Sequence, residues 1–207
     1  MSLPPRTIKC VLIGDDNAGK TSLMHTYASG RRPSPSSSCL EGLSKMVHVT
    51  AHHLNATYEL QLFDTLSGAG QLRSRLTAYS AYRDTDCALL CADLTEPSSW
   101  RRLEADWKAE LDTHLAGVPL VVAGTKAEAR DAIESSDAGA GEAMGSERGR
   151  RVAARLGAAA YRECSTVTGD GVAAVFADVL EAALHPQRRL PTRPLSVRDL
   201  WDKFTAR

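Results

Sequence analysis

Residues 8–21 read IKCVLIGDDNAGKT, and this stretch decides the fold. Residues 8–13 form a mostly apolar run of strand length, and residues 14–21 match the pattern GxxxxGK followed by Ser or Thr. Apolar residues with helical spacing follow at 20–27. A strand, a glycine-containing loop and a helix in this order are the setting in which this pattern binds phosphate groups.

The loop has a clear chemical interpretation. Its glycines let main-chain N–H groups converge on phosphate oxygens, and the amino terminus of the helix adds partial positive charge. Lys20 is placed to reach the β- and γ-phosphates, and the Thr21 hydroxyl is placed to ligate Mg²⁺. The alternative is a glycine-rich turn that joins strand to helix and binds no ligand.

The rest of the chain alternates strand-like and helical patterns. Apolar strand-like runs lie at residues 58–63, 87–92, 120–123 and 161–164, and helical patterns lie at 98–115, 146–156 and 172–184. This order predicts an α/β fold with a mostly parallel six-stranded sheet and helices on both faces. Residues 45–50 alternate apolar and polar before a turn at Asn55, which predicts one antiparallel strand at the sheet edge.

Some details of these elements can also be predicted. Thr95 or Ser98 is expected to cap the helix at 98–115, and Ser146 the helix at 146–156. Trp100 and Trp107 lie seven residues apart, so we expect them to share a helix face that packs on the sheet rather than on a partner. His52 and His53 point to opposite faces of a strand, which argues against a metal site.

Two segments and the carboxyl-terminal region lack the composition of a core. Residues 31–44 are rich in Ser and Pro, and residues 135–145 are rich in Gly, Ala and Ser. The composition shifts again after His185, so we expect one domain at residues 6–186 and a tail at 187–207 that contains prolines and arginines. Its apolar residues could dock on a partner or back on the domain.

Composition excludes several classes of protein. The 207 residues carry 25 Lys+Arg and 25 Asp+Glu, so no broad basic surface for nucleic acid is expected. No apolar run reaches the ~18 residues that a membrane span needs, and no signal peptide is evident, which predicts a cytoplasmic protein. The five cysteines form no CxxC pair, and we expect free thiols.

The ordered motifs resemble those of the Ras-superfamily small GTPases. They are GDDNAGKT at residues 14–21, FDT at 63–65, TKAE at 125–128 and ECST at 163–166, and the resemblance extends over residues 7–184. It is closest to the Rho subfamily, because TKxx replaces NKxD and DTD at 84–86 precedes the fourth strand. Residues 128–145 are long enough to match the helix that is inserted in Rho proteins.

The resemblance implies a P-loop NTPase G domain that binds GTP or GDP with Mg²⁺. The nucleotide-binding residues would be Gly14, Asp15, Asn17, Ala18, Gly19, Lys20, Thr21, Ser22, Asp64, Gly70, Thr125, Lys126, Glu128, Ser165, Thr166 and Val167. Thr21 and Asp64 would hold the metal, the latter through water. Lys20 and Gln71 would be the catalytic residues.

Two substitutions within the motifs change the expected chemistry. Glu128 replaces the family's aspartate that accepts two hydrogen bonds from guanine, and its extra methylene predicts weaker but still guanine-biased binding. Alternatively, Glu128 only begins the following helix. Asp16 stands where most members have glycine, and its side chain would crowd the catalytic glutamine, which predicts slow hydrolysis of GTP. Alternatively, the Asp16 side chain points to solvent or caps the helix.

The two switch regions depart further from the family. Residues 66–68 are an insertion relative to the family. If they loop out, Gly70 and Gln71 take the positions of the family's glycine and catalytic glutamine. If they do not, Gly68 or Ser67 takes the glycine position and the chain has no catalytic glutamine. The family's switch threonine is Cys39 here, a poor ligand for Mg²⁺, although a serine of residues 36–38 could substitute after a loop shift.

We therefore expect a Rho-type GTP/GDP switch with slow hydrolysis, and effectors and regulators that contact residues 31–44 and 66–82. The alternative is a pseudo-GTPase scaffold without productive nucleotide cycling; TKAE and ECST argue against a P-loop kinase or ATPase. The last cysteine is Cys164, so we expect no prenyl anchor and at most transient membrane contact.

Overall fold

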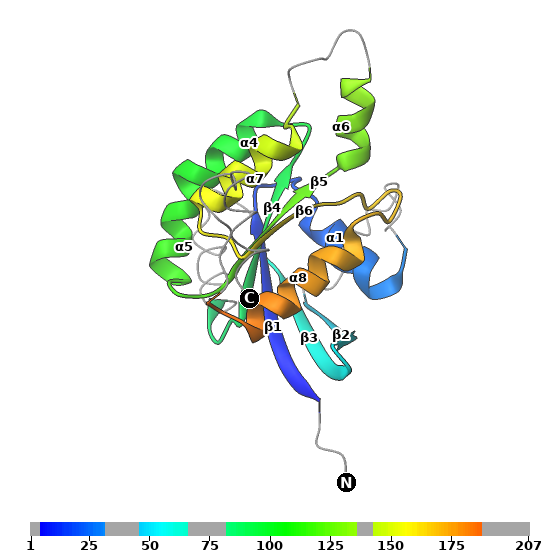
Figure 1. The fold of residues 1–207 in the computed structure, drawn as a ribbon, viewed down its shortest axis with the longest axis vertical. Helices are drawn as coiled ribbons and strands as arrows, with labels where there is room; N and C mark the ends of the chain where they lie inside the picture. Colours follow the sequence, from blue (N-terminus) through cyan, green and yellow to red (C-terminus); the bar gives the residue numbers. More distant parts are fainter. Residues whose placement is uncertain (1–4, 32–45, 66–81, 136–142, 188–207) are drawn as a thin grey trace, which may run out of the picture.

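The structure, a computed structural model, describes residues 5–31, 46–65, 82–135 and 143–187. Its strands are β1 (Arg6–Gly14), β2 (Met46–His53), β3 (Ala56–Asp64), β4 (Cys87–Asp93), β5 (Leu120–Thr125) and β6 (Ala160–Glu163). They form one sheet in the order β2-β3-β1-β4-β5-β6 (Figure 1). Only the β2–β3 pair is antiparallel among these strands, which confirms the predicted mostly parallel six-stranded sheet with one antiparallel edge strand.

Burial along the strands explains why the sequence predicts this order. Every residue of β5 is buried, and so are the residues of β4 up to Ala92, because helices cover both faces of these central strands. β2 instead alternates between exposed and partly buried residues up to Thr50, as expected for an edge strand. Continuous apolar runs thus mark the centre of the sheet, and the alternating segment marks its edge.

The helices lie on both faces of the sheet, as predicted (Figure 1). They are α1 (Lys20–Ser29), α4 (Pro97–Arg102), the π-helical turn η1 (Leu103–Trp107), α5 (Lys108–His114), α6 (Ala127–Glu134), α7 (Ser146–Arg155) and α8 (Val172–Leu184). Helices α1 and α8 pack on one face, and α4, η1, α5 and α7 pack on the other.

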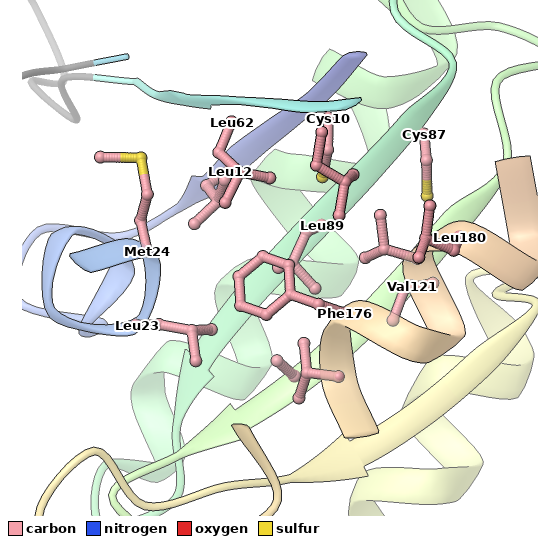
Figure 2. Close-up of a cluster of buried hydrophobic side chains, with 14 of the residues drawn as sticks. Cys10, Leu12, Leu23, Met24, Leu62, Cys87, Leu89, Val121, Phe176 and Leu180 are labelled. Carbon is pink, nitrogen blue, oxygen red and sulfur yellow. The ribbon is translucent and has the colours of Figure 1, made fainter. Parts of the chain in front are cut away.

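Each face of the sheet has its own apolar core. Figure 2 shows the core beneath α1 and α8, where the buried ring of Phe176 lies among aliphatic side chains from the sheet and from both helices. Tyr27 stacks on Phe176 with the ring centroids 4.0 Å apart. In the core of the other face, Trp100 meets Tyr161 edge-on at 5.9 Å. Trp100 is buried and Trp107 packs beside the same core, so the predicted sheet-facing side of this helix is confirmed.

The predicted helix at 98–115 differs in two details. It begins at Pro97 and contains the π-helical turn η1, in which the Lys108 N–H bonds to the Leu103 carbonyl. The cap prediction was wrong, because the side chain of Glu96 accepts the Ser98 N–H. The Thr95 hydroxyl instead donates to Asp93 Oδ1 at 2.7 Å.

The predicted cap of α7 was also wrong. Gly145 is the N-cap residue with an extended backbone, and Ser146 is the first residue of the helix. The Ser146 hydroxyl instead accepts a hydrogen bond from Arg130 Nη1 at 3.4 Å. The competing partner, 16 residues earlier in the chain, explains why the local pattern misled the prediction.

The four cysteines that the structure describes, Cys10, Cys87, Cys91 and Cys164, are buried free thiols, as expected. His52 contacts the Thr57 hydroxyl and His53 contacts Glu181 Oε2, and the described residues contain no group of three or more His, Cys, Asp or Glu placed to hold a metal ion. Within the described ranges, no helix is long and apolar enough to cross a membrane.

Candidate functional site

The loop between β1 and α1 has a backbone that only glycine permits at its first position. Gly14 has φ +135°, and a Cβ there would lie 2.3 Å from the Cys91 carbonyl oxygen of the neighbouring strand β4. Gly19, with φ +80°, is the N-cap of α1 and has no side chain to cover the N–H groups of the first turn. The loop therefore lies tightly against β4 and presents the amino terminus of α1 to a ligand.

The Lys20 side chain folds back over this loop. The residue is 6% exposed, and its Nζ donates to the carbonyl oxygens of Gly14 at 2.9 Å and Asp15 at 2.7 Å. Burial lowers the pKa of Lys20, and the surrounding negative groups, Asp64, Asp16 and Asp15 among them, oppose that shift. The ammonium is thus held at the loop, where an anionic ligand would stabilise its charge.

Thr21 and Asp64 come together although 43 residues separate them. Thr21 lies in the first turn of α1 and donates its hydroxyl proton to Asp64 Oδ2 at the end of β3. Thr65 fixes the end of this strand, because its hydroxyl donates to the Leu12 carbonyl of β1 at 2.8 Å. A hydroxyl and a carboxylate are hard oxygen donors, so this pair fits a Mg²⁺ ion.

Residues at the end of β5 connect the loop to the second half of the site. The buried Thr125 hydroxyl donates to the Ala18 carbonyl of the loop at 2.9 Å and lies 3.1 Å from the Ala92 carbonyl. Lys126 follows in a left-handed conformation with φ +62°, and its Nζ forms an ion pair with Asp93 Oδ2 at 2.5 Å. The ends of β4 and β5 thereby hold this lysine beside the phosphate loop.

Glu128 is in the first turn of α6, and one of its carboxylate oxygens, Oε2, is buried without a hydrogen-bond partner among the described residues. The nearby Cys164 thiol has its pKa raised to about 12, first by burial and then by the charges of Glu128 and Glu163. A buried, unpartnered carboxylate oxygen is energetically costly. Glu128 thus lies in the first turn of a helix, close to the predicted alternative, and it also keeps an acceptor that a ligand N–H could satisfy.

The segment after β6 forms a tight polar turn. The Ser165 side chain is buried and its Oγ accepts the N–H groups of Val167 at 3.1 Å and Thr168 at 3.0 Å. Val167 is 52% exposed and Thr166 is partly exposed. These are the positions where the resemblance places contacts to a base.

The remaining predicted residues are placed as follows. Asn17 adopts φ +62° in the loop and is exposed, as is Asp16, while Ser22 is partly buried in α1. Gly70, Gln71, Cys39, the serines at 36–38 and the insertion at 66–68 lie outside the described residues, as do the whole of residues 32–45 and the tail from 188 onward.

Sequence reasoning missed three polar groups around the site. Asp93 holds Lys126, and its position at the carboxyl end of a parallel strand is a signal that could have found it. Arg102 and Trp107 both donate to the Asp15 carboxylate, across 87 and 92 residues of sequence. No local pattern predicts a pairing at that separation.

The comparison with protein families agrees with this geometry. The family model described as "Ras family" matches residues 9–185, which is more than half of the chain and extends from within β1 to the end of α8. Members of that family are nucleotide switches that bind GTP or GDP with Mg²⁺. The chain thus belongs to the Ras family of small GTPases.

Proposed function

We propose that residues 6–186 form a G domain that binds GTP and GDP with Mg²⁺ and acts as a Rho-type switch with slow hydrolysis. One observation carries the proposal: the phosphate loop, the Thr21–Asp64 pair and the buried Glu128 oxygen lie at the carboxyl edge of the same sheet. Ligands of open α/β sheets bind at this edge.

The chemistry at the phosphate end follows from the contacts described above. Lys20 now donates to two loop carbonyls and would exchange them for the β- and γ-phosphate oxygens of a bound nucleotide. Thr21 and Asp64 would hold Mg²⁺, which neutralises phosphate charge when it is bound. In hydrolysis of GTP to GDP and phosphate, Lys20 would stabilise the charge that develops on the transferred group, and Gln71 would orient water.

At the base end, Thr125 would position the loop, Lys126 would flank the base, and Ser165, Thr166 and Val167 would contact its edge. Glu128 would accept hydrogen bonds from guanine through the oxygen that now lacks a partner among the described residues. The TKxx and DTD motifs support a Rho-type protein, and most of helix α6 lies within the stretch at 128–145 that resembles the Rho insertion.

Partners and location are proposed from the resemblance. Effectors and regulators would contact residues 31–44 and 66–82. The protein would be cytoplasmic, and arginines of the tail at 187–207 would allow transient contact with acidic lipid.

The nucleotide content of the purified protein tests the proposal. Liquid chromatography and mass spectrometry should find GDP or GTP in the denatured sample. Single-turnover hydrolysis of GTP should be slow, and Gln71→Leu should slow it further. An unchanged rate in Gln71→Leu would remove this residue from the mechanism.

A pseudo-GTPase scaffold is the second candidate, and Asp16 favours it. This exposed carboxylate adds negative charge to a loop built for anions, and Cys39 and the insertion at 66–68 also depart from the switch pattern. A site that contains no nucleotide and takes none up supports the scaffold. Bound GTP that stays intact for hours supports a switch that does not hydrolyse.

A further inference from the structure

The Asp15 carboxylate in the phosphate loop contacts the helix at 97–114, and both of its oxygens accept hydrogen bonds there. Arg102 Nε donates to Oδ2 at 2.8 Å, and Trp107 Nε1 donates to Oδ1 at 2.9 Å. The Asp15 side chain is only 14% exposed, whereas that of Arg102 is 44% exposed. The acid is thus held by a pair of donors from the helix at 97–114.

The π-helical turn explains how both donors reach one acid. Arg102 and Trp107 are five residues apart, and in an α-helix of 3.6 residues per turn such residues face different directions. The N–H of Lys108, the residue after Trp107, bonds to the Leu103 carbonyl five residues back, so this turn is wider by one residue than an α-helical turn. This widening brings residues five apart to the same side of the helix.

The Asp15 charge lies close to the machinery that would bind phosphate. Its own carbonyl oxygen accepts the Lys20 ammonium at 2.7 Å, and its carboxylate is among the charges that act on the pKa of Lys20. A released carboxylate could compete with the polyphosphate for Lys20 and would repel the polyphosphate directly. The two donors instead balance its charge and fix its direction.

We propose that Arg102 and Trp107 are positioning residues for the nucleotide: they hold the Asp15 carboxylate away from the phosphates and so slow nucleotide release. This inference rests on the proposed nucleotide binding. Two residues of the helix at 97–114 would then contribute to nucleotide affinity. A change in the position of that helix would change the rate of nucleotide release.

The test measures the dissociation rate of fluorescent GDP and GTP analogues from the full chain with Mg²⁺. Two variants remove one donor each: Arg102→Ala, and Trp107→Phe, which keeps an aromatic ring but loses the N–H. Each should release GDP about tenfold faster. The release of the GTP analogue should accelerate by a larger factor, because this analogue carries more charge. In an Asp15→Asn background, the same changes should alter the rate by less than about twofold. Arg101→Ala is the matched control, since Arg101 is exposed on the same helix, and it should leave the rate unchanged.

The outcomes separate the inference from the proposed function. The inference would be overturned if the Arg102 and Trp107 variants changed the release rate equally with and without the Asp15→Asn substitution. It would also be overturned if Arg101→Ala changed the release rate as much as Arg102→Ala. The proposed nucleotide binding would stand in both cases. A chain that binds neither analogue would overturn both. Arg102→Lys keeps the charge and should recover part of the slow release; if Arg102→Ala does not fold, Trp107→Phe and Arg102→Lys provide the same comparison.

Discussion

Glu128 shows how one side chain can be poorly satisfied in the unliganded fold and suited to a ligand. Its Oε2 is buried and lacks a hydrogen-bond partner among the described residues, at the point where the resemblance places guanine. Binding would supply the missing donors, so part of the affinity for guanine would come from relieving this cost.

Replacing Glu128 tests that role. Glu128→Ala should weaken GDP binding by about 10- to 100-fold, since one or two charge-assisted hydrogen bonds are lost. The melting temperature of the nucleotide-free protein should not fall, because the substitution also removes a buried oxygen that no described residue satisfies. Calorimetry and thermal melts measure the two effects, and unchanged GDP affinity would contradict the assignment.

A substitution of Thr21 tests the proposed Mg²⁺ site. Thr21→Ala removes a hydroxyl that contacts Asp64, and the dependence of GDP affinity on Mg²⁺, measured with the metal and with a chelator, should largely disappear. Thr26→Ala is the control on the same helix, because the buried Thr26 hydroxyl has no hydrogen-bond partner within the described part of the chain. A loss of metal dependence in both variants would show a general effect on α1 instead.

At the scale of elements, a polar network joins α6, β6 and α7. Arg130 Nη2 pairs with Glu163 Oε2 at 2.8 Å, and Tyr161 donates to Glu163 Oε1 at 2.7 Å. Burial acts to raise the pKa of Glu163, but hydrogen bonds from Arg130, Tyr161 and Ser146 outweigh it, so the pKa is below its usual value. The ECST segment is thereby fixed beside α6.

The pH dependence of stability should reveal this network. Because the pKa of Glu163 is lower in the folded than in the unfolded state, its stabilising contribution is present above the ordinary pKa of glutamate and is lost as the pH falls through the folded value. Glu163→Gln should lower the free energy of unfolding by about 2 kcal/mol at pH 7, and the difference should shrink below about pH 4.

Urea unfolding at both pH values measures the effect. Arg162→Ala provides the comparison, because the Arg162–Asp178 pair involves an arginine that is 51% exposed, and such pairs contribute about 0–1 kcal/mol. An equal loss in Glu163→Gln at about pH 7 and about pH 3 would contradict the proposed ionisation.

Helix α7 requires a glycine where it crosses β6. A Cβ on Gly149 would lie 2.3 Å from the Tyr161 hydroxyl oxygen and 3.3 Å from Trp100. Gly149→Ala should therefore destabilise the fold by about 1–3 kcal/mol, although alanine is the better helix former. Gly145→Ala, with no atom within 4 Å of the added Cβ, should cost less than about 1 kcal/mol in the same unfolding measurement; equal costs would contradict the packing argument.

The same elements show what the sequence could and could not predict. The helix at 172–184 was predicted with its observed limits, because its apolar pattern alone determines which face is buried. The caps at Thr95 and Ser146 were wrong. The side chain of Glu96 takes the capping position at the first helix, and the Ser146 hydroxyl bonds to Arg130, 16 residues earlier in the chain. Motifs located the phosphate loop, but Arg102 and Trp107 became visible only once the fold placed them on Asp15.

At the scale of the whole molecule, the candidate site is assembled from segments that lie far apart in the sequence. Its residues come from the loop after β1, the ends of β3, β4 and β5, and the turn after β6 (Figure 1). A ligand that contacts these segments together would stabilise the whole domain. We therefore expect GDP with Mg²⁺ to raise the melting temperature in a concentration-dependent way, by an amount that follows the dissociation constant.

Titration calorimetry on the full chain, after removal of any bound nucleotide, tests the central claim most directly. With Mg²⁺ present, the account predicts a clear heat of binding for GDP and a much weaker one for ADP, because Glu128 and the phosphate loop act on the same ligand. No heat with GDP, together with no nucleotide in the freshly purified protein, would contradict it.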